Sequence, residues 1–261
     1  MNRNTVQQVV TIDSRAEVAE GMFVLRFVSA EIAGSVKPGQ FVNIRAAEAI
    51  GGPLLRRPFS VSRVEGDKVE LFFNVIGTGT RLLSSKRVGD RLDVLGPLGK
   101  PYGLEDIGET AILVGGGLGV APFPLLTTAL VQSRKQILTL IGSRTKKQLY
   151  SDHLQNVHIA TDDGSKGFKG NVVELLENHL AGNTMVGAKI FGCGPTRMLM
   201  SLTSAAKKWN IPCELSLEGD MACGIGICQG CPVEVTKGKK KYSLVCTDGP
   251  TFNCLDVVLH G

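Results

Sequence analysis

Four cysteines near the carboxyl terminus constrain this chain more than any other feature of its sequence. Cys223, Cys228 and Cys231 stand in the order C-x4-C-x2-C, and Cys246 follows farther along the chain. This is the spacing of plant-type 2Fe-2S clusters, whose irons are held by four cysteine thiolates. The glycines among them can adopt positive φ, so the loop can wrap its sulfurs round a small inorganic group: Gly224, Gly226 and Gly230. The sequence therefore predicts a 2Fe-2S cluster with these four cysteines as ligands.

Two other interpretations of the cysteines stay open. One is a structural zinc site, which more often shows paired C-x2-C knuckles, and the other is a set of incidental free thiols. A disulfide network is less favoured because the seven cysteines are odd in number and suit a reducing compartment. The first ten residues lack a signal-peptide pattern, and no segment is long and apolar enough to span a bilayer. We therefore expect a cytoplasmic protein that does not insert into a membrane.

The length and the hydrophobic content bound the number of domains. With 261 residues, 43% of them hydrophobic, the chain can form two compact domains and a small module.

Part of the net charge of +5 comes from the lysine-rich stretch 237–241. We expect a solvated hairpin turn there, which returns the chain to Cys246. Nucleic acid is not an expected partner, because aromatic residues make up 5% of the chain and none interleaves these lysines.

Residues 1–102 consist of short strand-like runs separated by Gly, Pro, Asp or Ser. Several short strands at this spacing predict a small antiparallel β-barrel. The expected strands are Val6–Asp13, Met22–Val28, Phe41–Ile44, Phe59–Val64, Lys68–Val75 and Arg91–Leu95.

Two segments of the predicted barrel carry residues suited to phosphates and a flat ring. In the first, Arg56 and Arg57 precede Pro58, Phe59 and Ser60, a set that could clamp a diphosphate and lay a ring against the barrel. The second, residues 77–80, is a glycine and threonine turn that leads into an expected helix, whose free N–H groups favour an anion. Each signal is weak alone, since arginine pairs are usually solvated and such turns are common.

From residue 103 to residue 212 strands alternate with helices, a pattern typical of a parallel sheet. The buried run Thr110–Val114 ends in a glycine-rich turn and is followed by an expected helix, Phe123–Ser133. A strand, a glycine-rich turn and a helix in this order let the backbone approach a pyrophosphate. The glycines do not follow the strict G-x-G-x-x-G order, and such turns also occur for packing reasons. The turn at Cys193 and Gly194 is open to two interpretations, a nicotinamide-facing loop or a simple helix start.

Taken in order, these segments resemble the ferredoxin-NADP reductase superfamily in four motifs: Arg57-Pro-Phe-Ser60, Gly77-Thr-Gly-Thr80, Gly115-Gly-Gly-Leu-Gly-Val-Ala-Pro122 and Gly192-Cys-Gly-Pro195. The carboxyl-terminal part most resembles the electron-transfer subunits of NAD-dependent, two-subunit dihydroorotate dehydrogenases, in Met221–Cys228, Cys231 and Val245–Pro250. The resemblance covers essentially the whole chain. It implies an FAD-binding β-barrel domain at residues 1–102, an NAD-binding α/β domain at 103–212 and a 2Fe-2S cluster-binding module at 213–261.

The resemblance also implies roles for individual residues. FAD would be bound by Arg57, Pro58, Phe59, Ser60, Gly77, Thr78, Gly79 and Thr80. NAD would be bound by Gly115, Gly116, Gly117, Gly119, Cys193 and Gly194. Glu218, just ahead of the cysteines, would lie close to the flavin. The chain departs from the family at Asp220, where we expect arginine, so the contact that this arginine makes in relatives is in doubt here.

In this family the subunit relays electrons between a 2Fe-2S cluster, FAD and NAD. It serves an FMN-containing dihydroorotate dehydrogenase catalytic subunit, which makes orotate for pyrimidine synthesis, and a heterotetramer is the assembly that the resemblance implies. We expect no dihydroorotate-oxidising site in this chain, because a TIM-barrel catalytic subunit alone needs about 250 residues.

Other functions fit parts of the same sequence. One alternative is the flavin and iron–sulfur subunit of another complex, such as a ferredoxin-dependent transhydrogenase or a sulfide dehydrogenase. From a different class, the chain could be a zinc-stapled binding protein on a reductase-like scaffold. The choice between NAD and NADP also stays open, since Arg144 and Lys146 could accept a 2′-phosphate.

Overall fold

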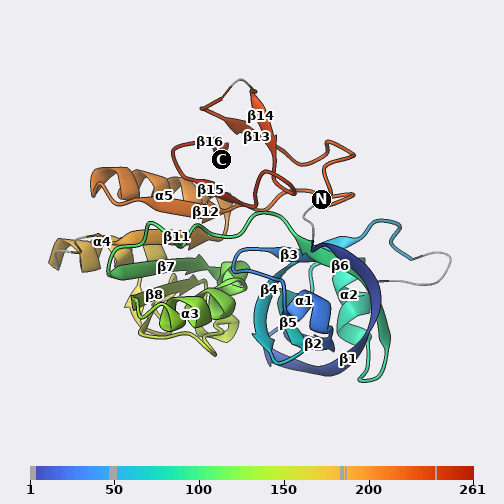
Figure 1. Cartoon of the computed structure of the whole chain (residues 1–261). Helices are drawn as coiled ribbons and strands as arrows, with labels where there is room; N and C mark the ends of the chain where they lie inside the picture. The colour runs from blue at the N-terminus through green and yellow to red at the C-terminus, as the bar shows by residue number, and fades with distance from the viewer. Residues whose placement is uncertain (1–3, 47–51, 183–184, 186, 239) are drawn as a thin grey trace.

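The computed structural model describes residues 4–46, 52–182, 185, 187–238 and 240–261. It contains a closed β-barrel, a mixed and mostly parallel sheet flanked by helices, and a small three-stranded sheet near the carboxyl terminus. Figure 1 shows the small sheet above the junction between the barrel and the large sheet. The predicted fold class is therefore confirmed.

The barrel is formed by six antiparallel strands in the order β1-β2-β5-β4-β3-β6. Their bounds are β1 Val6–Ala19, β2 Met22–Val28, β3 Phe41–Arg45, β4 Arg57–Glu65, β5 Lys68–Asn74 and β6 Arg91–Leu98. Its interior is filled by alternate side chains of these strands, including Phe27, Leu71 and Phe73, each at most 1% exposed. Two helices accompany the strands, α1 Ala30–Ala33 and α2 Thr78–Ser85.

The first strand is longer than the sequence predicts. We expect it to end at Asp13, where the residues become polar, but β1 continues to Ala19 and pairs with β2 through a bulge after Ile12. The extension is mostly exposed. Cross-strand pairing in the β1–β2 hairpin therefore sets this strand end, and local hydrophobicity does not.

The large sheet has the order β10-β9-β8-β7-β11-β12-β15. Its strands are β7 Thr110–Gly116, β8 Gln136–Ser143, β9 Val157–Thr161, β10 Phe168–Lys169, β11 Lys189–Cys193, β12 Cys213–Ser216 and β15 Thr251–Asn253. All neighbouring pairs are parallel except β12 and β15. Strands β12 and β15, which both lie within residues 213–261, therefore belong to the large sheet and not to the small one.

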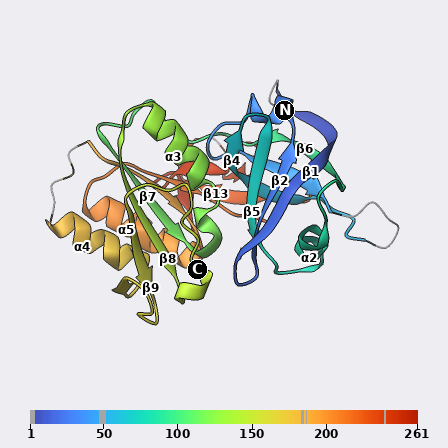
Figure 2. The same cartoon turned by 90° about the horizontal axis from the view of Figure 1, so that it is seen from below.

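Helices cover both faces of the large sheet. One face packs on α3 Phe123–Gln132, while the other packs on α4 Val172–Gly182 and α5 Thr196–Lys208. Figure 2 shows these helices beside the barrel, seen from below. Short 3-10 turns, η1 Gly117–Val120 and η2 Lys146–Gln148, follow two of the strands. Among the described residues, no helix is long and apolar enough to cross a bilayer.

The expected hairpin near the carboxyl terminus is confirmed. Strands β13 Pro232–Val235 and β14 Tyr242–Leu244 pair in antiparallel fashion, and β16 Val257–Val258 completes the small sheet. Directly after β14, the Val245 N–H donates to the Cys231 carbonyl at 2.9 Å, which returns Cys246 to the other cysteines.

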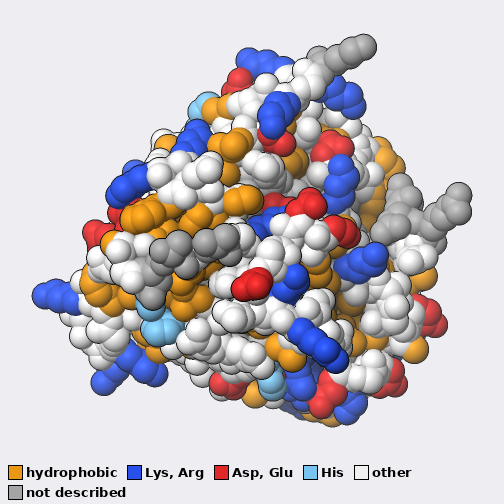
Figure 3. Space-filling view, turned by 60° about the vertical axis from the view of Figure 1, so that its left-hand side comes forward, with side chains coloured by type: hydrophobic (Ala, Val, Ile, Leu, Met, Phe, Trp, Pro, Cys, Tyr) orange, Lys and Arg blue, Asp and Glu red, His pale blue; other side chains and the backbone are white. Residues whose placement is uncertain are grey.

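Two lysines of this hairpin are paired with carboxylates. Lys237 lies 2.8 Å from Asp256 and Lys241 lies 3.9 Å from Glu234, while Lys239 is outside the described residues. On the face of the molecule shown in Figure 3, basic and acidic side chains are mixed over the surface.

A buried ion pair holds the segment that links the barrel to the sheet. Lys189 Nζ lies 2.7 Å from Glu214 Oε1 and donates to the Gly103 carbonyl at 2.8 Å. The Gly103 N–H in turn donates to Glu214 Oε2 at 2.9 Å. The linking segment is therefore fixed to β11 and β12 by a pair that has little access to water.

We predict that Lys189→Met destabilises the protein far more than Lys208→Met. Both lysines lie 2.7 Å from a glutamate, but their side chains are 8% and 62% exposed. Removing one partner of a buried pair costs about 3–5 kcal/mol because the other charge stays buried, whereas an exposed pair contributes about 0–1 kcal/mol. The free energy of unfolding in urea measures both losses. Equal losses in the two variants would contradict the role assigned to Lys189.

Candidate functional site

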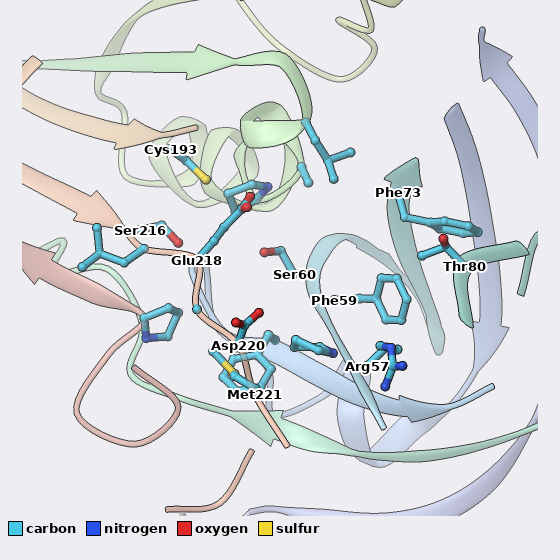
Figure 4. A pocket seen from close by; sticks show the side chains of 18 of the residues that line it. Arg57, Phe59, Ser60, Phe73, Thr80, Cys193, Ser216, Glu218, Asp220 and Met221 are labelled. Atoms are coloured by element: carbon cyan, nitrogen blue, oxygen red, sulfur yellow. The ribbon is translucent and has the colours of Figure 1, made fainter. Parts of the chain in front are cut away.

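A cavity of about 660 Å³ lies where the barrel, the large sheet and the cysteine-bearing segment meet. Its walls come from all three parts, as Figure 4 shows. Seven of the residues expected to bind FAD or NAD, or to lie by the flavin, line it: Arg57, Pro58, Phe59, Ser60, Thr80, Cys193 and Glu218. Residues far apart in the chain are thus brought together in one space.

The barrel wall of the cavity has a site suited to an anion at the start of α2. Gly77 precedes this helix and has no side chain to cap it, so the first N–H groups face outward. Thr80 Oγ1 accepts from the Gly77 N–H at 3.1 Å and fixes the turn. A Cβ added at Gly79 would lie 3.2 Å from Arg57, so this arginine packs directly over the first turn. Thr78 is the first residue of the helix.

The two neighbouring arginines have different surroundings. Arg56 pairs with Asp93 at 2.6 Å and donates to the Asn43 and Asp93 carbonyls, so it holds strands together. Arg57 donates to the carbonyls of Leu55 and Arg56, and it lines the cavity. Of the two cations that the sequence offers for a diphosphate, Arg57 is the one in position.

Phe59 and Ser60 stand on β4 at the centre of the barrel wall. Phe59 packs edge-on against Phe73 with ring centroids 5.5 Å apart, and it is 8% exposed. Ser60 points into the cavity, toward the wall that carries Glu218 (Figure 4). With Pro58 beside them, these side chains form a largely apolar surface that a flat ring can contact.

The two glycine-containing turns of the sheet pack against each other. A Cβ at Gly119 would lie 2.1 Å from the Cys193 carbonyl, and one at Gly194 would lie 3.1 Å from the Gly116 nitrogen. Gly115 is similarly crowded by Phe123 at 2.9 Å. Only a glycine fits such close backbone approaches, which accounts for these positions by packing.

Gly117 differs from the other glycines of its turn. It has φ +55°, and a Cβ added there would meet nothing within 4 Å. Its neighbour Leu118 lines the cavity, as do Ala121 and Pro122. The open space at Gly117 is therefore suited to a ligand.

Cys193 and Glu218 face the cavity from the sheet side. Desolvation raises the pKa of Cys193 to about 12, and the nearby Glu218 charge adds to the effect. Desolvation by the cavity walls also raises the pKa of Glu218, although solvent within the cavity reaches its side chain. At neutral pH Cys193 is thus a neutral thiol beside a carboxyl group that holds its proton more tightly than usual.

The four cysteines of the predicted metal site form two pairs. The thiol of Cys223 is in hydrogen-bond contact with Cys228, and that of Cys246 with Cys231. Cys231 and Cys246 are 4% and 1% exposed, whereas Cys228 is exposed. A binuclear cluster takes two cysteines for each iron, so this pairing fits it.

Backbone N–H groups point at the sulfurs of the loop. Partial burial alone raises the pKa of Cys223, but the N–H groups of Cys228 and Ile225, at 3.4 and 3.5 Å, help to lower it to about 7. The Gly230 N–H donates to the Cys228 sulfur at 3.4 Å. Such donors stabilise thiolates, the form that binds metal. Among the described residues, no three His, Cys, Asp or Glu side chains are arranged to hold one metal ion.

The cysteine loop borders the cavity directly, a contact that sequence reasoning missed. Ala222 and Gly230 line the cavity, and they precede Cys223 and Cys231 in the chain. Asp220, where the resemblance leads us to expect arginine, also lines it. Other lining residues without a motif signal include Phe72, Asn74, Ile76, Ser216 and Leu217.

The fold and the site define a class of protein, an oxidoreductase of the ferredoxin-NADP reductase type with an attached iron–sulfur module. Residues 218–258 match the family model described as the iron-sulfur cluster binding domain of dihydroorotate dehydrogenase B. The chain is 36% identical to the electron transfer subunit of dihydroorotate dehydrogenase B (NAD(+)) of Desulforamulus reducens, covering 92% of this chain and 94% of that one. The corresponding subunit of Bacillus caldolyticus is also 36% identical, over 96% and 98%. This chain belongs to the family of electron-transfer subunits of NAD-dependent dihydroorotate dehydrogenase B.

Solved structures agree with this assignment. A structure of the NADH-dependent reduced ferredoxin-NADP oxidoreductase, described in the context of flavin-based electron bifurcation, superposes with a TM-score of 0.86 and 30% identity, covering 97% of this chain and 90% of that one. Phthalate dioxygenase reductase shares the fold with a TM-score of 0.63 and 14% identity, covering 89% of this chain and 88% of that one.

The raised pKa of Glu218 predicts a pH-dependent stability. The native state holds this proton more tightly than the unfolded chain does, so the contribution of Glu218 to stability falls as pH rises from the ordinary carboxyl pKa through the raised one. Because glutamine cannot ionise, Glu218→Gln should gain stability relative to the parent above that window and show no such gain below it. Free energies of unfolding across the pH range measure this. A difference that is the same at every pH would contradict the prediction.

Proposed function

We propose that this chain carries electrons between NAD and a partner subunit, through an FAD in the cavity and a 2Fe-2S cluster on Cys223, Cys228, Cys231 and Cys246. The observation that supports this most directly is that one cavity is bordered by the barrel, by the turn at Cys193 and by the cysteine loop. A group bound there would be adjacent to both of its electron partners.

The barrel residues would bind and orient the FAD. The diphosphate fits the start of α2, where Gly77, Thr78 and Gly79 offer backbone and Arg57 offers a positive charge. The ring system fits the apolar surface of Pro58 and Phe59, with the Ser60 hydroxyl as a hydrogen-bonding group. A flavin exchanges electron pairs with nicotinamide and single electrons with an iron–sulfur cluster, which is the chemistry this position requires.

The sheet residues would bind NAD. Gly117, with open space above it, and the close-packed Gly115, Gly116 and Gly119 form the turn for the pyrophosphate. Cys193 and Gly194 would lie next to the nicotinamide, where the neutral Cys193 thiol adds no charge. The acidic turn at Asp162 and Asp163, bonded through its N–H groups to the 143–144 loop, favours a free ribose hydroxyl and hence NAD over NADP.

The proposed partner is an FMN-containing dihydroorotate dehydrogenase catalytic subunit, in a heterotetramer. Its contact surface would include Ile227, which is 77% exposed next to Cys228. Ile225, the other apolar residue of the loop, packs against the core instead. The two isoleucines of the loop would therefore have different roles. The cell compartment that we propose is the cytoplasm.

One observation favours a second candidate within the same class. The structure with the highest TM-score among those named above is that of an NADH-dependent reduced ferredoxin-NADP oxidoreductase. Anaerobic affinity purification from native cells, followed by a dihydroorotate:NAD⁺ assay, distinguishes the two. A partner chain with orotate-forming activity supports the first proposal, whereas flavin and iron without this activity supports the second. A colourless protein that contains zinc would contradict both.

The cluster assignment predicts a selective loss of electron transfer. Cys228→Ser should abolish electron transfer beyond the FAD. NADH oxidation with an artificial acceptor that takes electrons directly from the FAD should continue, because the barrel and the glycine turns are unchanged. Iron content, visible spectra and both activities measure this. Cys254→Ser, which replaces a cysteine outside the loop, is the control and should retain both activities. Unchanged transfer in Cys228→Ser would contradict the assignment.

The partner surface predicts a second selective loss. Ile227→Asp should weaken association with the catalytic subunit by about tenfold or more, since a central apolar contact would be replaced by a charge. Val88→Asp is a matched control, because Val88 is 66% exposed but lies on the barrel between α2 and β6. Binding measured with both purified subunits tests this. If Val88→Asp weakens binding equally, Ile227 is not specific to the interface.

A further inference from the structure

A buried amide on the barrel contacts the cysteine loop. Asn43 lies on β3 between Val42 and Ile44, whose side chains enter the barrel core, so its own side chain points out of the barrel. It is 0% exposed. Its Nδ2 donates to the Cys223 carbonyl at 3.2 Å, which links the barrel to the first ligand of the proposed cluster.

The same amide is in close steric contact with the next residue of the loop. Gly224 has φ +72°, and a Cβ added there would lie 2.5 Å from Asn43 Nδ2. The glycine therefore lets the loop approach the amide closely enough for the hydrogen bond to form. Asn43 thus restrains both Cys223 and Gly224.

The oxygen of the Asn43 side chain indicates why the hydrogen bond to Cys223 matters. Asn43 Oδ1 is buried and has no hydrogen-bond partner among the described residues. An unpartnered buried acceptor is unfavourable, and an apolar side chain of the same shape would avoid it. The hydrogen bond from Asn43 Nδ2 to the Cys223 carbonyl therefore explains why an asparagine, and not a leucine, stands at this position.

The backbone of Asn43 is fixed relative to the cavity. Asn43 pairs across β3 and β4 with Pro58, which lines the cavity. Arg56 Nη1 donates to the Asn43 carbonyl at 3.3 Å, and Arg56 is itself held by Asp93. A short path of contacts thus runs from the cavity wall through Pro58 and Asn43 to Cys223.

We propose that Asn43 is a positioning residue for electron transfer, which holds the Cys223 side of the cluster loop against the barrel and so fixes the separation between the flavin and the cluster. This inference rests on the proposed function, since it requires both groups to be bound. A misplacement of reacting groups by about 1 Å can cost about 100-fold in rate, so loss of this restraint acts on transfer between the two groups. It leaves the nicotinamide turns, on the other side of the cavity, unchanged.

The test compares two buried amides of the same barrel region in the purified holoprotein with its partner subunit. Asn43→Leu keeps the shape and removes the donor. Gln40→Met is the matched control, because Gln40 is 1% exposed and its Nε2 donates at 2.8 Å to the Gly99 carbonyl, away from the cysteine loop. After rapid mixing with NADH, the first phase of flavin bleaching reports the arrival of electrons at the FAD, because the FMN of the partner subunit would be reached only through the cluster. The electron paramagnetic resonance signal of frozen samples reports reduction of the cluster.

In Asn43→Leu, cluster reduction should slow about tenfold or more while flavin bleaching changes by less than about twofold, on the scale expected for a small misplacement. Gln40→Met should change neither rate. If the leucine variant does not fold or does not hold the cluster, Asn43→Ala, which also removes the donor and adds no bulk, should give the same selective slowing.

The outcomes separate this inference from the proposed function. A parent protein without flavin or iron would overturn the proposed function and this inference with it. A parent that holds both groups, with Asn43 variants that reduce the cluster as fast as Gln40→Met does, would overturn the role of Asn43 alone. Equal slowing of flavin bleaching and cluster reduction would also overturn it, because it would indicate a general structural defect.

Discussion

The antiparallel pairing of β12 with β15 is the constraint on which the candidate site depends. The Leu217 N–H donates to the Pro250 carbonyl, and the Cys254 N–H donates to the Cys213 carbonyl, both at 2.9 Å. The chain between Leu217 and Pro250 therefore leaves and re-enters the same edge of the large sheet. Glu218, the cysteine loop and the β13–β14 hairpin all lie within this segment. The pairing therefore helps to fix both the cavity wall and the cysteines relative to the barrel.

The parallel part of the sheet adds a second constraint. In the register of β7, β11 and β12, Cys193 lies beside Gly115 on one side and Ser216 on the other. These residues are at or near the carboxyl ends of their strands, where α/β sheets bind ligands. The turns that follow are thereby aligned along one edge that faces the barrel. The cavity is thus a consequence of strand register as much as of the individual side chains.

The sequence was sufficient for features that depend on local spacing. The cysteine pattern, the hairpin that returns Cys246 and a helix close to residues 77–80 each follow from neighbouring residues. The structure contains the hairpin, and its helix begins at Thr78, within the segment that the sequence assigns to the turn. The ends of strands were harder to predict from the sequence. In β1, pairing with β2 extends the strand through polar residues. The pairing of β15 with β12 could not be predicted, since a three-residue strand has no periodicity of its own.

Choices between similar neighbours also lay beyond the sequence. Arg56 and Arg57 are equivalent as a motif, but an ion pair with Asp93 assigns the first to the barrel. Ile225 and Ile227 differ because one packs on the core and the other faces solvent. Asn43 carries no motif, and its contact with Cys223 joins residues 180 positions apart. In each case the partner that decides the role is distant in the chain, so no local pattern contains the information.

The packing of the cysteine loop gives the site an inner and an outer side. Ala222 and Gly230, at the two ends of the loop, border the cavity, while Ile227 and Cys228 at its tip are exposed. The buried thiols of Cys231 and Cys246 anchor the loop between these sides. A cluster held here would be bounded by the flavin cavity on one side and by an open surface on the other. This arrangement supports the proposed order of electron transfer, from the turn at Cys193 through the cavity and the cysteine loop to the exposed surface at Ile227.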